Sequence, residues 1–169
     1  MTTATAAASN NNSKKDNGNN SSQHEGKTRR KESTTRYRIL LVDDDHDILF
    51  TFKEGLEEND DAVVDKSQLF GGAKIQVDTF ADPKKALSSF KAGVYDLLLL
   101  DIRMRDMNGF ELYEELKKID DKPKVCFITA YELYYEALKK DFPKLDVGCF
   151  MKKPISLEDL ATKISEELA

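Results

Sequence analysis

Side chains that could do chemistry stand directly after four short apolar runs of this sequence. In chain order they are Asp43-Asp44-Asp45, Asp101, Thr129 and Lys152-Lys153-Pro154. Carboxylates crowded within a few ångströms repel one another, and each resists ionisation unless a cation shares the site. Ligation by oxygen alone favours Mg²⁺, which binds a few carboxylates and keeps several waters.

An acid cluster, a hydroxyl and an ammonium suit one class of reaction. Asp101 could be a carboxylate nucleophile, and Thr129 and Lys153 could bind the oxygens of a phosphoryl group. Phosphoryl transfer depends mainly on positioning and charge neutralisation, which these groups supply. Taken singly, the three aspartates could merely cap a helix and Lys-Pro could form a turn. Their shared position after apolar runs favours phosphoryl transfer.

The apolar runs bring these side chains together only if they are parallel strands of one sheet. The predicted strands are 37–42, 74–79, 97–100, 125–128 and 147–151. The predicted helices begin near Ile48, at Asp82-Pro83 (ending at Gly93), at Phe110, at Tyr131 and at the capping box Ser156-Leu157-Glu158-Asp159. This alternation predicts a parallel sheet with helices on both faces. Ligands of such sheets bind at the carboxyl ends of the strands.

The charge of the chain is split between two parts. Residues 1–36 hold seven basic and three acidic residues and no Val, Ile, Leu, Phe, Tyr or Trp. We expect a disordered, polar, basic tail there, because such a segment cannot bury enough apolar surface to fold. The whole chain has a net charge of −5, so residues 37–169 carry −9. An acidic folded part argues against direct DNA binding, since phosphate contacts need positive charge.

The remaining composition indicates a soluble protein of the cytoplasm. No stretch approaches the ~20 apolar residues of a transmembrane helix, and the polar first thirty residues are not a secretory signal. Cys126 and Cys149 lie in apolar runs, which predicts two buried thiols in a reducing compartment rather than a disulfide. The connection over residues 59–73 is long for a compact domain, and such loops are either functional or disordered.

Residues 37–169 resemble the receiver domain of two-component response regulators. The motifs that carry the resemblance are Ile39-Leu40-Leu41-Val42-Asp43-Asp44-Asp45, Leu99-Leu100-Asp101-Ile102-Arg103-Met104, Met107-Asn108-Gly109, Ile128-Thr129-Ala130 and Lys153-Pro154. The resemblance implies a flavodoxin-like, doubly wound sheet of five parallel strands in the order 2-1-3-4-5, with five helices. Arg105 and Asp106 depart from the family, which usually has Pro and Gly in the loop after the phosphoacceptor.

The resemblance also implies a role for each site residue. Asp101 would be the phosphoacceptor and a ligand of Mg²⁺. The other metal ligands would be Asp44 directly, Asp43 mostly through water, and the backbone carbonyl of Arg103. Thr129 would hydrogen-bond a phosphoryl oxygen, Lys153 would pair with the phosphoryl group, and Phe150 would occupy the aromatic switch position. The Lys153-Pro154 peptide bond is expected to be cis, as it is in the family.

We therefore expect a stand-alone receiver, because only three residues follow the last predicted helix. It would accept a phosphoryl group from a sensor histidine kinase or a phosphotransfer protein. Although not a conventional enzyme, it would promote its own phosphorylation and dephosphorylation. Its signal would pass to a partner protein through the surface formed by the fourth helix, the fifth strand and the fifth helix.

Two other functions compete with this interpretation. A haloacid-dehalogenase-type phosphatase would use Asp43 and Asp45, followed by a Thr and a Lys, but it needs a further acidic pair after the lysine. The acids beyond Lys153 lie on an apparent surface helix, and such an enzyme has no use for Asp101. The third candidate is a receiver-like interaction module that is never phosphorylated, and the intact set of acids with Thr129 and Lys153 argues against it.

Overall fold

The computed structural model describes residues 36–57, 65–130 and 149–169. The strands are β1 (Arg36–Val42), β2 (Lys74–Phe80), β3 (Leu97–Asp101), β4 (Lys124–Thr129) and β5 (Cys149–Lys152). The helices are α1 (His46–Glu57), α2 (Lys66–Leu69), α3 (Pro83–Ser89), α4 (Gly109–Ile119) and α6 (Leu157–Leu168). The predicted tail lies outside the described residues, apart from Arg36, which begins β1. The helix predicted to begin at Tyr131 also lies outside them.

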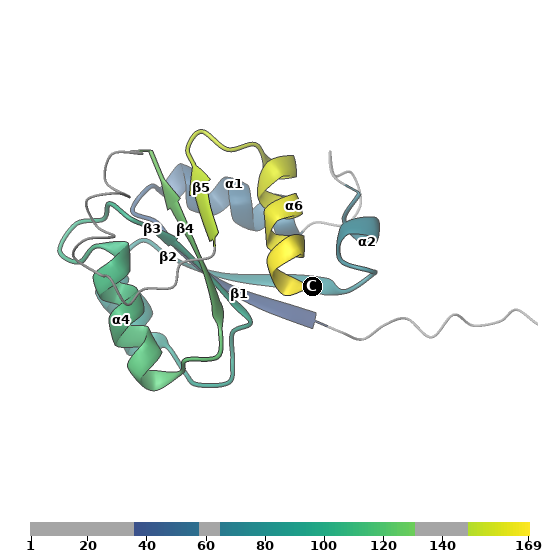
Figure 1. Cartoon of the computed structure of the whole chain (residues 1–169). Coiled ribbons are helices and arrows are strands. Elements are labelled where there is room, and N and C mark those ends of the chain that lie inside the picture. Colours follow the sequence, from purple (N-terminus) through teal and green to yellow (C-terminus); the bar gives the residue numbers. More distant parts are fainter. Residues whose placement is uncertain (1–35, 58–64, 131–148) are drawn as a thin grey trace, which may run out of the picture. The chain divides into compact units, whose positions relative to one another are not determined.

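The five strands form one parallel sheet in the order β2-β1-β3-β4-β5, which confirms the predicted fold (Figure 1). The central strand β3 is buried along its whole length. This explains the unbroken run of four leucines, since a strand covered on both faces exposes neither set of side chains. β2 lies at the edge of the sheet and alternates in sequence, as predicted for an edge strand.

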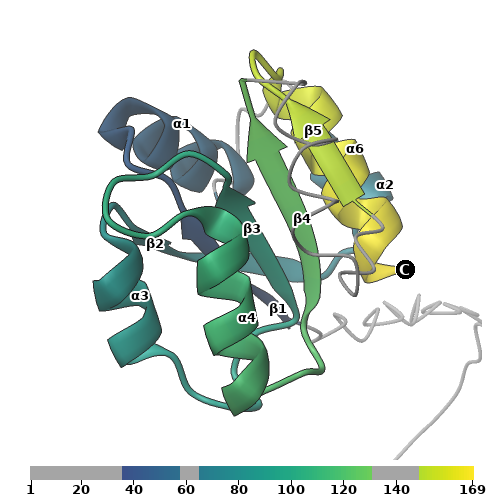
Figure 2. The same ribbon diagram turned by 60° about the vertical axis from the view of Figure 1, so that its left-hand side comes forward.

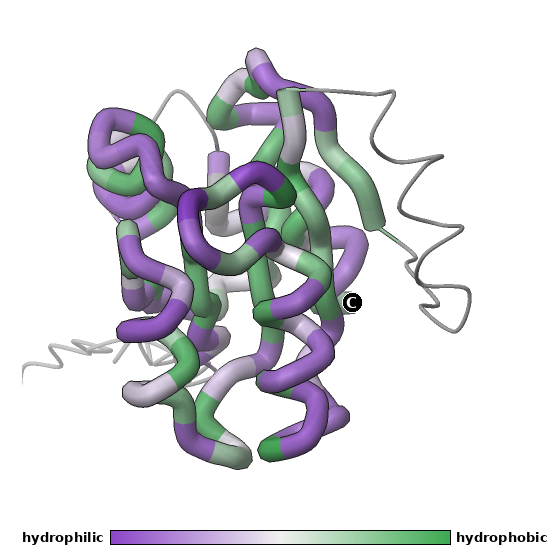
Figure 3. Tube along the Cα trace, turned by 90° about the vertical axis from the view of Figure 1, so that its left-hand side faces the viewer, coloured by the Kyte–Doolittle hydropathy of each residue, from purple (hydrophilic) through white to green (hydrophobic). Residues whose placement is uncertain are grey.

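Helices cover both faces of the sheet and divide the core into two layers. On one face α1 and α6 pack on Leu41 and Leu99, and on the other α3 and α4 pack on Leu40 and Leu98 (Figure 2). The two sets alternate along each strand because successive side chains point to opposite faces. The hydrophobic residues accordingly concentrate in the strands (Figure 3).

Short polar signals fix where the helices begin. Asp82 caps α3 by accepting from two backbone N–H groups, and Asn108 and Glu111 form a capping box at α4. Ser156 caps α6 at the predicted position by accepting from the Asp159 N–H at 3.0 Å. The Asp159 carboxylate accepts from the Ser156 hydroxyl at 2.7 Å, whereas a full capping box has a bond from the Ser156 N–H. These caps fix the residue at which each helix begins.

The end of α3 differs from the prediction. The helix ends at Ser89 rather than at Gly93, because Phe90 adopts an extended conformation and its N–H turns back to the Leu87 carbonyl. Gly93 instead occupies the turn that follows, with φ at +73°. Its N–H donates to the Asp120 carboxylate at 2.7 Å. The glycine therefore serves a turn and not the helix end.

The described part of the long connection, residues 65–73, contributes to the core. It contains α2, which lies against α6. Phe70 is buried in the same hydrophobic cluster as Leu56 and Ile164. This segment therefore covers apolar surface between the flanking helices.

The prediction of two separate thiols was wrong. Cys126 and Cys149 are joined by a disulfide, with their Cα atoms 4.5 Å apart. The two residues are directly paired on the neighbouring strands β4 and β5. Their burial was predicted correctly, but the strand register that brings the sulfurs together is a property of the assembled sheet.

Candidate functional site

Polar residues from four strands gather at the carboxyl end of the sheet. Asp43 follows β1, Asp101 and Thr129 end β3 and β4, and Lys153 follows β5. Among the described residues, Asp43, Asp101 and Thr129 are the polar or charged residues that are buried. Burial of two carboxylates is costly unless a cation or hydrogen-bond donors compensate them.

Three carboxylates form a compact cluster. One oxygen each of Asp43, Asp44 and Asp101 lies within 4.8 Å of the others. Asp45 has a different role, because its carboxylate accepts from the Asp47 N–H at 2.9 Å and from the Ile48 N–H at 3.4 Å. These bonds cap α1, so the Asp45 carboxylate is occupied at the start of the helix and is not part of the cluster.

The Lys153 ammonium bridges two of these carboxylates. Its Nζ atom donates to Asp43 Oδ2 at 2.6 Å and to Asp101 Oδ1 at 2.7 Å. The backbone N–H of Lys153 donates to the Thr129 carbonyl at 2.8 Å, and the Lys153-Pro154 peptide bond is cis, as predicted. Burial alone would lower the pKa of Lys153, but its hydrogen bonds to Asp101 and Asp43 outweigh burial and raise the pKa. The lysine is therefore held in its charged form.

The surroundings of Asp101 depend on a close approach between β3 and α4. A Cβ atom at Gly109 would lie 2.3 Å from the Asp101 carbonyl oxygen, so only glycine fits there. The Gly109 N–H donates to the Ile102 carbonyl at 3.0 Å, which fixes the loop after Asp101. Burial raises the pKa of Asp101, and the neighbouring charge of Asp43 adds to the rise despite the pairing with Lys153.

The remaining predicted residues lie around this centre. Thr129 is buried at the last position of β4. The half-buried Phe150 ring has its centroid 5.6 Å from that of Phe127 and 6.2 Å from that of Phe110. Arg103 follows Asp101 by two residues. The roles of Thr129, Phe150 and the Arg103 carbonyl stay predictions.

The donor set suits a hard divalent cation. It consists of carboxylate oxygens alone, and three of them lie close enough to share one ion. Mg²⁺ prefers such oxygen ligands and completes its shell with water. Asp43, Asp44 and Asp101 are thus the side chains that could hold it.

One further residue near the cluster could not be placed from the sequence. Arg105 Nε lies 3.9 Å from Asp44 Oδ2, and its side chain is 90% exposed. The next residue, Asp106, has φ at +69°, and the Met107 N–H donates back to the Arg105 carbonyl at 2.8 Å. The sequence identified Arg105 and Asp106 as departures in this loop, but gave no sign that Arg105 reaches the acid cluster.

We expect Arg105→Ala to lower the Mg²⁺ concentration needed for half-saturation, by about twofold at low salt. The guanidinium competes with the ion for Asp44, so its removal leaves that carboxylate available. The measurement is the melting temperature as a function of added Mg²⁺, since a ligand of the folded state raises it. Asp44→Ala serves as the reference and should lose the Mg²⁺ response.

The effect of Arg105 should shrink at high ionic strength, because exposed charges are screened. If Arg105→Ala and the unmodified protein reach half-saturation at the same Mg²⁺ concentration at low salt, Arg105 does not affect Mg²⁺ binding.

Comparison with known proteins gives a consistent result. A family model described as the response regulator receiver domain matches residues 66–165. The matched range includes Asp101, Thr129 and Lys153, and the structure adds Asp43 and Asp44, which follow β1.

Among curated proteins, the chain is 36% identical over 88 residues to the transcriptional regulatory protein ZraR of Klebsiella oxytoca. It is 34% identical over 93 residues to the aerobic respiration control sensor protein ArcB of Escherichia coli. The matches cover 50% and 53% of this chain, but only 19% and 12% of those two proteins.

Among solved structures, a CheY-like receiver domain protein from Methanospirillum hungatei is 29% identical, with a TM-score of 0.60 over 79% of this chain and 94% of that one. TrrA from Thermotoga maritima, solved with Mg²⁺ and beryllofluoride, is also 29% identical, with a TM-score of 0.58 over 78% of this chain and 99% of that one.

Proposed function

The chain belongs to the response regulator receiver family, and on this basis we propose that it accepts a phosphoryl group on Asp101 in a Mg²⁺-dependent reaction. The donor would be the phosphohistidine of a sensor histidine kinase or of a phosphotransfer protein. The observation that carries the proposal is the bridge from Lys153 to Asp43 and Asp101, beside a third carboxylate. The Asp101 carboxylate, as the nucleophile, and the Lys153 ammonium are thereby held side by side.

The chemistry needs little rearrangement of this site. An Asp101 oxygen would attack the phosphorus, forming an O–P bond while the P–N bond to the donor imidazole breaks. Bound Mg²⁺ would neutralise charge on the phosphoryl oxygens. Lys153 would exchange its contact with Asp101 for one with the phosphoryl group, and the Thr129 hydroxyl would donate to another oxygen. Donors that already stand beside the reacting oxygens are effective because little reorganisation is needed during the reaction.

A groove beside Lys153 could admit the donor. It has a volume of about 470 Å³. It is lined by Asp47, Ile48, Thr51, Phe52, Ala130, Lys153, Pro154 and Ile155. Phe50, on the same helix α1, is 68% exposed and is the most exposed large apolar residue among those described. Access to Asp101 from this side agrees with the small Ala130, which leaves room for a phosphodonor.

The first test is mass spectrometry after incubation with acetyl phosphate and Mg²⁺. We expect one phosphoryl group, lost in hydroxylamine as an acyl phosphate is, and located on Asp101 by peptide mapping. Phosphate on Asp43 would favour the phosphatase alternative, and an unmodified chain would favour the interaction module.

The signal would leave through Phe150. Phosphate on Asp101 adds nearly two negative charges and three acceptor oxygens. Movement of Thr129 toward that group would vacate space at the end of β4, and Phe150 could then turn inward into that space. Because Phe150 has no hydroxyl, its inward state gains only apolar burial. We therefore expect a shift between two populations rather than an all-or-none change.

Amide chemical shifts with and without Mg²⁺ and beryllofluoride test this route. Changes should extend from Asp101 to β5 and to the start of α6, along the surface proposed for the partner protein. Changes confined to residues 43–45 and 101–105, with β5 silent, would contradict it.

We also propose a cytoplasmic location, because phosphohistidine donors are made from ATP inside the cell. In the described ranges no helix combines the length and apolar character needed to cross a membrane. The acidic net charge of residues 37–169 supports a protein partner rather than DNA.

A further inference from the structure

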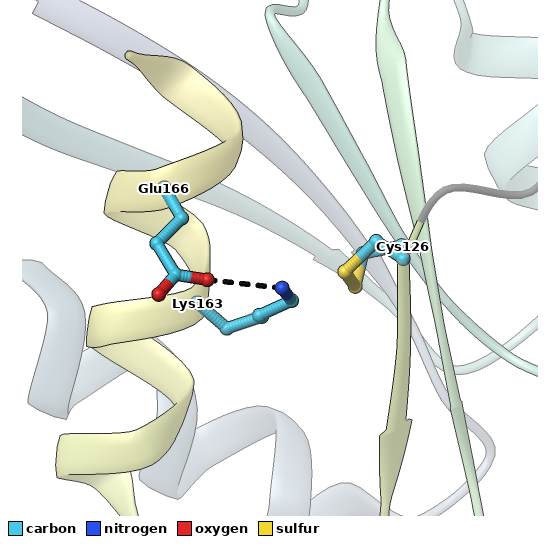
Figure 4. Close-up of a disulfide and its surroundings, with 4 residues drawn as sticks. Cys126, Lys163 and Glu166 are labelled. Atoms are coloured by element: carbon cyan, nitrogen blue, oxygen red, sulfur yellow. Dashed lines mark hydrogen bonds and ion pairs between the residues drawn. A yellow bond between two sulfur atoms is a disulfide. The ribbon is translucent and has the colours of Figure 1, made fainter.

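The disulfide between Cys126 and Cys149 joins the two strands that carry the proposed switch. The two residues are register partners, and the next pair in the same ladder is Phe127 with Phe150. Their Cα separation of 4.5 Å lies within the range that a disulfide accepts. Figure 4 shows the bond between the strands, on the side that faces α6.

The cross-link constrains the end strand of the sheet. In the described part of the chain β5 pairs with β4 alone. Phe150 follows Cys149 directly, and Lys153 lies four residues after Cys149. With the bond in place, β5 is tied covalently to β4 beside Phe150. Without the bond, β5 is held by the backbone ladder to β4 and by the packing of its side chains in the core.

The sulfurs occupy the opposite face of the sheet from Phe150. Cys126 and Cys149 belong to the core layer under α1 and α6, whereas Phe150 packs on the layer under α3 and α4. Forming or breaking the bond therefore leaves the aromatic contacts of Phe150 in place. It changes how freely the strand that carries Phe150 can move.

The surroundings allow thiol–disulfide exchange. Figure 4 shows the Lys163 side chain extending from α6 toward Cys126, with its ammonium 2.9 Å from a Glu166 oxygen. The thiolate is the form of a cysteine that attacks a disulfide. Both cysteines are buried, so exchange needs local opening of β5, and an edge strand opens at lower cost than a central one.

We propose that Cys126 and Cys149 are a reversible redox pair that sets how readily Asp101 takes the phosphoryl group. The oxidant is a small disulfide and the reductant a dithiol. One cysteine thiolate attacks the small disulfide to form a mixed disulfide and release a thiol. The second cysteine then displaces the other thiol, so two electrons and two protons leave the protein.

This inference rests on the proposed function, and the structure indicates which redox form should favour phosphorylation. In the disulfide-bonded structure Lys153 holds Asp101 and Asp43, which is the arrangement without a phosphoryl group. Because the disulfide ties β5 to β4 beside Phe150, it should favour that arrangement and oppose the turn of Phe150. By linkage, formation of the disulfide makes the phosphorylated form of Asp101 less favourable, and phosphorylation of Asp101 in turn favours reduction of the disulfide.

The test compares the full chain in its oxidised and reduced forms. Oxidised and reduced dithiothreitol set the two forms, and intact mass distinguishes them by two hydrogen atoms. Titration with beryllofluoride at saturating Mg²⁺, followed by amide chemical shifts, gives the dissociation constant of each form. We expect the oxidised form to bind about fivefold more weakly, with the largest differences in β4 and β5.

Cys126→Ala/Cys149→Ala is the matched control, and its dissociation constant should not respond to dithiothreitol. If that variant fails to fold, comparison of the two forms of the unmodified chain still decides the question. Equal constants in the two forms, or thiols that never form the bond, would overturn the redox proposal while beryllofluoride binding preserves the proposed function. No binding in either form would overturn both.

Discussion

Asp101→Asn is expected to abolish phosphorylation by acetyl phosphate and Mg²⁺ and, at the same time, to make the metal-free protein more stable. The first effect follows because an amide oxygen is not a nucleophile for phosphorus under these conditions. The second follows because Asp101 is buried beside Asp43. A residue under ordinary structural selection seldom combines loss of function with a gain in stability, so the pair of outcomes identifies a functional carboxylate.

The direction of the stability effect follows from the raised pKa of Asp101. Burial, with the charge of Asp43, raises this pKa above the ordinary value of 3.8. When the folded protein raises the pKa of a carboxyl group, the protonated group stabilises the fold. This stabilisation is complete at a pH below the ordinary pKa and is lost as the pH rises through the raised pKa. Near neutral pH the unmodified protein has lost it. Asparagine does not ionise, so we expect a melting temperature about 3 °C higher.

Asp106→Asn is the matched control for this prediction. It makes the same chemical change in the same loop, at an exposed side chain. It should remain phosphorylated, with a melting temperature close to that of the unmodified protein. Phosphorylation of Asp101→Asn at the normal rate would mean that another carboxylate is the acceptor.

The architecture of the sheet could be predicted because its causes are local. The leucines at 97–100 form a strand covered on both faces, and the alternation in β2 indicates an edge strand. Parallel strands joined by helices then place all carboxyl ends at one edge. The proximity of Asp43, Asp101 and Lys153 follows from that topology, although their sequence separations are large.

What the sequence could not supply depends on register and on side-chain reach. The bond between Cys126 and Cys149 requires β4 and β5 to pair in one particular register. The contact of Arg105 with Asp44 depends on the reach of a long, exposed side chain. Neither feature has a signal in residue spacing.

Some residues were also ambiguous because the same residue type is found in two different local structures. Gly93 suits a helix end as well as a turn, and the structure uses it in the turn. Residues 65–73 offered no long periodic run, yet Phe70 anchors them in the core. Asp45 stood in the acid run but caps α1. Tertiary contacts decided the outcome for Gly93 and Phe70, whereas local hydrogen bonds at the start of α1 decided it for Asp45.

Lys153→Met is expected to destabilise the metal-free protein by about 3 kcal/mol near neutral pH, which corresponds to about 10 °C in melting temperature. Methionine keeps much of the volume but removes the ammonium that bridges Asp43 and Asp101. The two carboxylates are 1% and 6% exposed at their side chains. They would then be buried at close range without a cation, which is among the costliest changes a single substitution can cause.

Three conditions should restore stability if this account is correct. Mg²⁺ supplies another cation for the same carboxylates. Lower pH protonates Asp101, whose raised pKa rises further without the ammonium, so the melting temperature of Lys153→Met should approach that of the unmodified protein as the pH falls. Adding Asp101→Asn to Lys153→Met removes one of the charges, and the two effects should not add because the residues are in contact.

Lys152→Met is the control for loss of a lysine at this edge of the sheet. Lys152 is exposed and precedes Lys153 directly. Because an exposed ion pair contributes at most about 1 kcal/mol, its replacement should change the melting temperature by less than about 4 °C. A loss of stability in Lys153→Met that neither Mg²⁺, acid nor Asp101→Asn reverses would mean that the lysine acts through packing. Reversal by all three would show that its role is to hold together two buried carboxylates which a phosphoryl group and its metal later share.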